Sequence, residues 1–461
     1  MLRPDRSGSA DRSGSGDRAD SADRAGSARA GSAGAGARRR IGAGLLDQVV
    51  MALANAGNAV LGLTLLEPGR FGVLVISLGL GYLVIGLNRA FVGDVLLALA
   101  ARHDGEQRER LVRNGLATAL TVGAVAGLVF AAIWAAWPRG WSIDLRDLIW
   151  IAPFLPVLLL HDTGRYSHLA DRRPGRALVM DLVWVGAQGV LLVVFLLNDI
   201  APAPALLCSW GLGAAAGATV FVLRGRVSPL GGSPRQWLAE TRHLAGWFTA
   251  WGVIGQLHTQ AVGFLVAGLL STRELAGLRA AQIGVLQPMQ NFVSAVQSLL
   301  VPRVSRLAGD AERLSGEEGV AAALAFRRQV RTVVLGFLGL AAAAVLVAAP
   351  VAYLVLHSIA KYRFAAPIAI PMSMQAGLYL VQVPFTAALR GMHLGRTLVT
   401  QYAIFAVVSL AGLVLGALAG GLVGAVWGLL IGTALGLTVM VALYARAVRA
   451  LGPAAASSSL P

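Results

Sequence analysis

Polar side chains recur along one apolar segment, residues 275–300, which is long enough to cross a membrane as a helix. Arg279, Gln282, Gln290, Asn291 and Gln297 fall within one half of the helix circumference, because successive residues are turned by about 100°. Amide and guanidinium groups bind hydroxyl, phosphate and carboxylate groups, whereas lipid tails cannot solvate them. The spacing therefore predicts a helix that presents a polar face to a water-filled cavity. In the alternative interpretation, the amides only hold packed helices together.

The other half of this helix is apolar and is expected to lie against lipid; it carries Val285, Phe292, Val296 and Leu299. Arg279 is expected to contact an anion in the cavity. An arginine in lipid is costly, and a guanidinium offers forked donors to a phosphate or a carboxylate.

Three further apolar segments carry polar residues that are expected to line the same cavity. They are Asn55 and Asn58 in 42–66, Gln256 and Gln260 in 244–270, and Gln375 and Gln382 in 365–389. In each pair the two residues share one face of a helix, as a common cavity requires.

Ionisable residues inside the apolar segments form a second set, the candidates for ion or charge coupling: Asp47, Arg89, Asp94, Asp181 and His258. Arg89 is expected to pair with Asp94 or Asp47, which lie near the same depth. Two alternatives stay open, namely that Arg89 extends to the membrane surface and that His258 is a neutral histidine bonded to a neighbouring helix.

The amino-acid composition indicates which kind of secondary structure positions these residues. The chain is 56% hydrophobic and 13% charged, with a mean hydropathy of +0.68, and a soluble domain carries about twice that share of charge. Cys208 is the single cysteine, so an internal disulfide is excluded. The chain is therefore predicted to be an all-α integral membrane protein.

Hydropathy predicts twelve transmembrane helices. They cover about 42–66, 71–97, 115–137, 147–164, 177–198, 202–223, 244–270, 275–300, 330–356, 365–389, 396–418 and 422–445. Twenty-two arginines fall in loops on the side of the N-terminal tail, against six basic residues on the other side. This bias places both termini in the cytoplasm of a bacterial cell with the protein in its inner membrane. The net charge of +16 is thus expected to meet anionic lipids and not nucleic acid.

The expected division has five parts. These are a disordered cytoplasmic tail (1–40), a six-helix bundle (41–223), a cytoplasmic linker (224–243), a second six-helix bundle (244–446) and a cytoplasmic tail (447–461). Residues 62–79 and 267–284 echo each other, each with a tight turn followed by glycines seven apart. Such duplication is typical of transporters whose site lies between two repeats.

Motifs for enzymatic chemistry are lacking in the sequence. There is no His/Cys cluster with metal-ligand spacing, no nucleotide-binding loop, and no D-x-D in a predicted external loop. We therefore expect neither an enzyme nor a protein with a cofactor or bound metal, and transport energy would have to come from a gradient.

Several short motifs resemble the polysaccharide and oligosaccharide-lipid exporters of the multidrug/oligosaccharidyl-lipid/polysaccharide (MOP) superfamily, over residues 41–450. They are Asp47-Gln48 followed by Asn55, L-L-E-P-G-R-F-G at 65–72, N-R-A-F-V-G-D at 88–94, H-D-T-G-R-Y at 161–166, and L-R-A-A-Q through L-V-P-R at 278–303.

The resemblance implies a MATE-like fold, with two six-helix bundles around a cavity that opens alternately to each side. It also implies a flippase or exporter in which a cavity arginine meets the pyrophosphate or acidic sugars of a polyprenyl-linked glycan. Polysaccharide polymerases or glycosyltransferases would then be partners. Two alternatives remain, a multidrug or metabolite cation antiporter of the same superfamily and a non-transporting scaffold of an envelope-polymer synthase.

Overall fold

A computed structural model describes most of the chain. The described residues are 49–100, 105–138, 144–171, 173–225, 228–287, 316–392 and 394–457, with the single positions 42, 46, 47, 289, 290 and 293. The expected N-terminal tail (1–40) and the cavity residues Asn291 and Gln297 lie outside this set.

The first half of the described chain is helical throughout, and several of its helices begin with proline, which suits the first turn because its missing N–H would have no partner there. A helix over residues 49–65 is followed by α2 (Pro68–Asn88), the π-helical turn η1 (Arg89–Gly93) and α3 (Asp94–Ala100). Then come α4 (Gly105–Ala136), α5 (Leu148–Ile151), η2 (Ala152–Phe154), α6 (Leu155–Ala170), α7 (Pro174–Leu197) and α8 (Pro202–Gly225).

The second half follows a short turn, η3 (Pro229–Gly231). Its elements are α9 (Pro234–Leu269), a helix over residues 272–287, α11 (Gly316–Ser358), η4 (Ala360–Ile368), α12 (Ala369–Gly391) and α13 (Gly395–Ser457). The Ser233 side chain caps α9 by accepting a hydrogen bond from the Gln236 backbone N–H. α9 thus begins within the range expected to be a linker.

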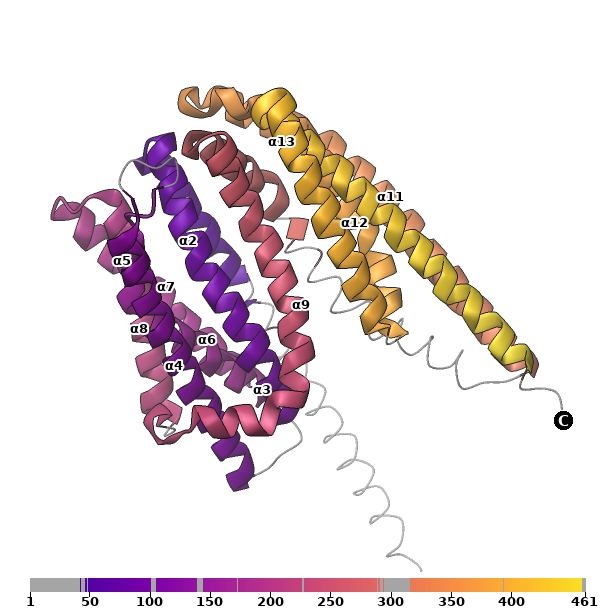
Figure 1. Cartoon of the computed structure of the whole chain (residues 1–461), viewed down its shortest axis with the longest axis horizontal. Coiled ribbons are helices and arrows are strands. Elements are labelled where there is room, and N and C mark those ends of the chain that lie inside the picture. The colour runs from indigo at the N-terminus through magenta and orange to yellow at the C-terminus, as the bar shows by residue number, and fades with distance from the viewer. Residues whose placement is uncertain are drawn as a thin grey trace, which may run out of the picture.

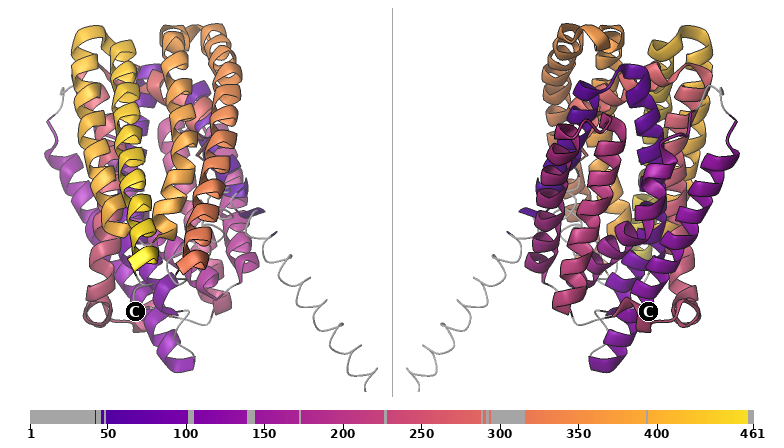
Figure 2. Two further views of the ribbon diagram at one scale, coloured as in Figure 1. Left: turned by 90° about the vertical axis from the view of Figure 1, so that its right-hand side faces the viewer. Right: turned by 90° about the vertical axis from the view of Figure 1, so that its left-hand side faces the viewer.

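The long element α13 consists of two helices that meet at Gly420–Gly421. Gly421 has φ +58°, a conformation in which a side chain would be strained. The two arms run side by side (Figure 2) and touch through glycines, since a Cβ on Gly416 would lie 2.0 Å from the Gly424 carbonyl oxygen.

Wherever the structure describes them, the twelve predicted spans correspond to helices, and the all-α fold class is confirmed. Among the described helices, seven are long and apolar enough to cross a membrane, and the apolar stretches Val49–Leu65 and Val253–Leu269 are shorter. The protein is a multi-pass membrane protein.

The helices form two groups with α2 and α9 between them. In Figure 1, α4 to α8 lie on one side and α11 to α13 on the other. α9 packs against α2 and also against α13. The end of the molecule that carries the turns at 66–67 and 270–271 together with η4, at the top of Figure 1, is called the arginine-poor end below.

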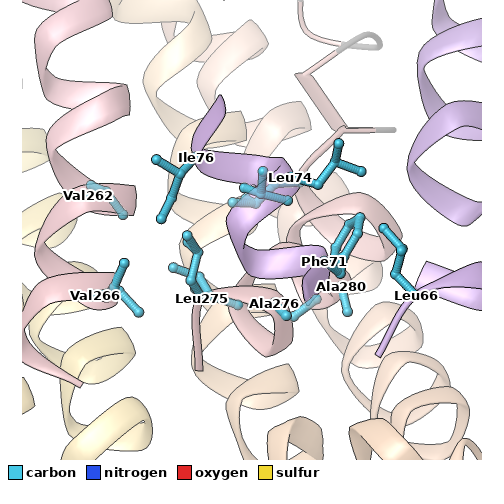
Figure 3. Packing of buried hydrophobic residues seen from close by; sticks show 14 of the residues in the cluster. Leu66, Phe71, Leu74, Ile76, Val262, Val266, Leu275, Ala276 and Ala280 are labelled. Carbon is cyan, nitrogen blue, oxygen red and sulfur yellow. The ribbon is translucent and has the colours of Figure 1, made fainter. Parts of the chain in front are cut away.

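The core near this end joins both halves of the sequence. Figure 3 shows Phe71 and Ile76 of α2 among Val266 of α9 and Leu275 and Ala276 of the following helix. α2 thus packs between two helices of the second half, and their shared core supports the cavity described below.

Gly72 marks the closest contact in this region, and its replacement by alanine is expected to destabilise the fold by about 1–3 kcal/mol. The added Cβ would lie 1.9 Å from the Thr272 backbone oxygen, and backbone cannot move aside easily. Gly284, which echoes Gly79 in the second half, has nothing within 4 Å of such a Cβ and serves as the unpacked control. Gly284→Ala should therefore be neutral or slightly stabilising. Thermal unfolding of the purified variants in detergent measures both, and equal losses would contradict the close contact.

Candidate functional site

A cavity of about 720 Å³ lies among α2, α9, the helix 272–287, α12 and α13. Seven residues from the expected polar set line it, and they come from three of the predicted spans: Arg279, Gln282, Gln290, Gln256, Gln260, Gln375 and Gln382. His258, expected among the coupling residues, lines it too. The amides therefore converge on one space.

A smaller cavity of about 240 Å³ adjoins the first and shares Gln256, Gln260 and Arg279 with it. Its other polar lining includes Asn55 and Asn58 of the first helix. Tyr82 also lines it and donates a 3.4 Å hydrogen bond to the Asn55 side-chain oxygen. The expected residues of the first helix therefore reach the same polar region from the opposite side.

Arg279 is the charged group at the junction of the two cavities. Its guanidinium donates to the Gln282 side-chain oxygen at 2.9 Å. Among the described residues that line either cavity, it is the only arginine or lysine, and none is a carboxylate. The lining thus combines a single fixed positive charge with many neutral hydrogen-bonding groups, which suits a ligand rich in hydroxyl groups that also carries an anion.

The face of this helix that was expected to meet lipid is instead packed against protein at Val285, which is 3% exposed. That part of the prediction is wrong, because the helix has neighbours on more than one side. Phe292, Val296 and Leu299 lie outside the described residues.

Hydrogen bonds to α13 hold two of the polar lining residues, Gln375 and His258, in place. The Gln375 amide donates to the Thr433 hydroxyl at 3.1 Å and to the Tyr379 hydroxyl at 3.3 Å. His258 Nε2 lies 3.3 Å from the Ser409 hydroxyl, in a hydrogen bond whose direction depends on the tautomer. A cavity wall fixed in this way presents its free donors and acceptors in a defined arrangement.

Glycines of α2 make room for the α9 amides. A Cβ on Gly79 would lie 2.5 Å from the Gln260 side-chain oxygen, and a Cβ on Gly86 would lie 2.4 Å from the Gln256 amide carbon. The two glycines are seven residues apart and share one face of α2. This face lets the glutamines lie along α2 and border both cavities.

A second cluster of charged residues lies within the first half of the molecule. Arg165 of α6 forms ion pairs with Asp47 of the first helix and with Asp181 of α7, the latter at 2.8 Å. Asp47 is 1% exposed and Asp181 is 0% exposed, so the guanidinium of Arg165, and not bulk water, stabilises the negative charge of both carboxylates. His161 Nε2 also lies 3.6 Å from Asp181.

Arg89 pairs with Asp162, not with Asp94 or Asp47 as expected. Its Nε donates to both Asp162 oxygens at 3.0 and 3.1 Å, and its second nitrogen reaches one of them at 2.7 Å. Arg89 begins the π-helical turn η1, a distortion that often occurs at functional sites. Asp94 begins α3 and is only half-buried.

Arg165 was missed as a site residue because the hydropathy span was taken to end at 164, which placed it in a loop, and Asp162, although inside that span, was not singled out. In the structure α6 continues to Ala170 and Arg165 is buried. The motif H-D-T-G-R-Y carried the signal, since residues three apart on a helix lie on one face. Within the described residues, no three or more histidine, cysteine or carboxylate side chains are grouped as metal ligands.

Comparison with known proteins agrees with this architecture. Residues 179–358 match the model of a family described as polysaccharide biosynthesis protein. A search of curated proteins found no match.

Among solved structures, the chain is similar to the inward-facing conformation of a multidrug-resistance MATE family transporter of the MOP superfamily. The TM-score is 0.66 and the identity 14%, with 88% of this chain and 98% of that chain covered. It is also similar to the MATE transporter VcmN of Vibrio cholerae in the bent form, with a TM-score of 0.57, 14% identity, and 90% and 98% covered.

A third similar structure is a MOP superfamily transporter from Pyrococcus furiosus, for which a reverse polarity of the binding pocket suggests a different function. The TM-score is 0.60 and the identity 14%, with 89% of this chain and 94% of that chain covered. The chain thus has the fold of MATE transporters of the MOP superfamily. Together with the family match over 179–358, this supports the resemblance to the polysaccharide biosynthesis proteins of that superfamily.

Proposed function

We propose that this protein flips or exports a lipid-linked oligosaccharide, or another cell-envelope polysaccharide intermediate, across the bacterial inner membrane by alternating access. The fold and the family match support a membrane transporter of the MOP superfamily and leave the substrate open. The observation that favours a glycan is the lining of the larger cavity. Arg279 there accompanies several glutamines, and no carboxylate occurs among the described lining residues.

The chemistry of this lining argues for an anionic substrate rich in hydroxyl groups. Amides donate to and accept from sugar hydroxyls, and a guanidinium binds a phosphate or a uronic-acid carboxylate through two parallel hydrogen bonds. An organic cation would be repelled by the Arg279 guanidinium, and no carboxylate among the described lining residues could offset the repulsion. The proposal therefore ranks a polyprenyl-linked glycan above a drug-like cation, and it assigns the protein transport and no catalysis.

The buried charges of the first half are proposed to serve coupling. Among the described residues, Arg89 pairs with Asp162, and Arg165 pairs with both Asp47 and Asp181, so two buried carboxylates share one guanidinium. Protonation of one of these two acids would change the pairing of the other, as coupling to a proton gradient requires. Anionic lipids, and a polysaccharide polymerase or glycosyltransferase, are the proposed partners at the membrane.

Transport can be tested with purified protein in liposomes. A fluorescent polyprenyl-linked acidic oligosaccharide should move between leaflets faster than in liposomes without protein, as measured by protection of the label from an impermeant quencher. Ethidium loaded into the same vesicles should leak no faster than in the controls. Ethidium transport without glycan transport would favour the cation antiporter instead, and movement of neither compound would favour the scaffold.

The proposed orientation places both termini in the cytoplasm, and two matched cysteine variants test it. Arg273 and Arg173 are both exposed arginines, expected on opposite sides of the membrane. With Cys208 replaced by alanine, Arg273→Cys in intact cells should react with an impermeant thiol reagent. Arg173→Cys should react only after the membrane is opened. The reverse pattern would invert the topology, and equal labelling would contradict the twelve-span arrangement.

A further inference from the structure

The two halves of the sequence meet at the arginine-poor end through the chain's one lysine. Lys361 lies in η4 and its ammonium donates to two backbone carbonyls, those of Thr64 at 3.0 Å and of Leu66 at 2.9 Å. These carbonyls are almost 300 residues away in the sequence. The contact thus ties the second half to the end of the first membrane helix.

The two carbonyls belong to a place where a cation is favoured. The first helix ends at residue 65, and the last carbonyls of a helix have no partner within it. They also form the negative end of the helix dipole, so a positive group there is attracted as well as hydrogen-bonded. An ammonium fits because its three donors can point to separate acceptors, whereas a guanidinium fork fits one planar partner.

Further contacts between the halves surround this point. Gly69 of α2 lies against Thr272, with 3.8 Å between a Cβ built at position 69 and the Thr272 hydroxyl oxygen, and Gly72 touches the Thr272 backbone. Within the second half, the Arg273 guanidinium carbon lies 4.4 Å from the centre of the Phe364 ring, which ties the residue after Thr272 to η4. This end of the molecule is therefore closed by backbone and side-chain contacts around Lys361.

We propose that Lys361 is a latch of the arginine-poor end: its bonds to the Thr64 and Leu66 carbonyls hold that end closed and must break whenever the cavity opens there. The inference rests on the alternating access proposed above and adds the residue that opposes opening at one side. Among the 39 lysines and arginines of the chain, this position alone is a lysine. Loss of the ammonium should shift the protein towards the state open at this end.

Closure can be measured by a disulfide between Gly69→Cys and Thr272→Cys, placed in the full-length protein with Cys208→Ala. The Cβ built at position 69 and the Thr272 hydroxyl oxygen are within disulfide reach when this end is closed. Lys361→Met should slow oxidative cross-linking about fivefold or more relative to the parent. The rate of Lys361→Arg should lie between those of the parent and Lys361→Met. Arg363→Met is the matched control, because Arg363 lies two residues away and, within the part of the chain that the structure describes, bonds to the His357 carbonyl of its own half and not to the first half. It should cross-link at the parent rate.

Three outcomes would overturn the latch: a parental cross-linking rate in Lys361→Met, equal slowing by Arg363→Met, or an Lys361→Arg variant as slow as Lys361→Met. Misfolding is recognised separately, because each variant is compared only after it elutes as a single species from gel filtration. The cross-link needs no substrate, so it reports closure even where glycan transport in liposomes fails. Failure of the transport proposal and failure of the latch therefore give different results.

Discussion

Replacing Arg279 by glutamine is expected to lower translocation of an acidic glycan-lipid in liposomes by about tenfold or more. Hydrogen bonds to a charged group contribute about 1.5–3 kcal/mol, and about 1.4 kcal/mol corresponds to a factor of ten. No other arginine or lysine among the described lining residues could take over the anion. Arg279→Lys should restore part of the rate, because an ammonium keeps the charge but loses the forked geometry.

The variant should remain folded, because Gln282 and the water of the cavity can solvate a glutamine at this position. The matched control is Arg331→Gln, the same change at an exposed arginine of α11 that lines neither cavity. It should transport like the parent. Equal losses in the two variants would point to a general effect of charge, and parental transport by Arg279→Gln would remove Arg279 from the substrate path.

Replacing Arg165 by methionine is expected to cost about 3–5 kcal/mol of folding free energy, since it leaves two buried carboxylates without their cation. Asp47 and Asp181 are the carboxylates concerned. Adding Asp47→Asn and Asp181→Asn to the same chain should restore a large part of the loss, because the buried negative charges are then gone. Thermal unfolding in detergent, with the retained monodisperse fraction, measures each variant.

A surface ion pair provides the contrast. Arg113 pairs with Glu109 on α4 at 2.7 Å, and both side chains are well exposed. Arg113→Met should cost less than about 1 kcal/mol, as exposed pairs usually do. If Arg165→Met were as mild as Arg113→Met, the buried cluster would contribute little to the fold. If the triple variant were no better than Arg165→Met alone, uncompensated charge would not be the cause of the loss.

Much of the architecture could be predicted from the sequence because lipid limits what a spanning segment can be. Apolar length locates the helices, and an amphipathic pattern locates the polar face of 272–287, since both depend only on the geometry of one helix. The convergence of Gln256, Gln260 and Gln375 on the cavity also follows from such faces. The hydrogen bond of Gln375 to Thr433 and the packing of Gln256 and Gln260 against the α2 glycines do not, because these depend on how helices cross.

The wrong expectations share one physical origin. Hydropathy counts an arginine as a loop residue, so Arg165 was placed outside the membrane, although two buried acids compensate its charge inside α6. Asp94 and Asp47 were suggested as partners of Arg89 because they lie at a similar depth in the membrane. The partner is decided instead by which neighbouring helix the Arg89 side chain faces. Val285 was assigned to lipid because one helix viewed alone does not reveal its neighbours. Pairing between elements is therefore what the sequence could not supply.

Direct binding to the purified protein tests the central claim that the cavity around Arg279 holds a sugar-rich anion. Affinity should be measured for three ligands in detergent: an acidic glycan-lipid, the same lipid with its glycan acid groups and phosphate methylated, and ethidium. The affinity for the acidic ligand should be higher than that for the methylated one by about tenfold or more. This difference in affinity should disappear in Arg279→Gln. Ethidium binding more tightly than either glycan-lipid, unaffected by Arg279→Gln, would contradict the account.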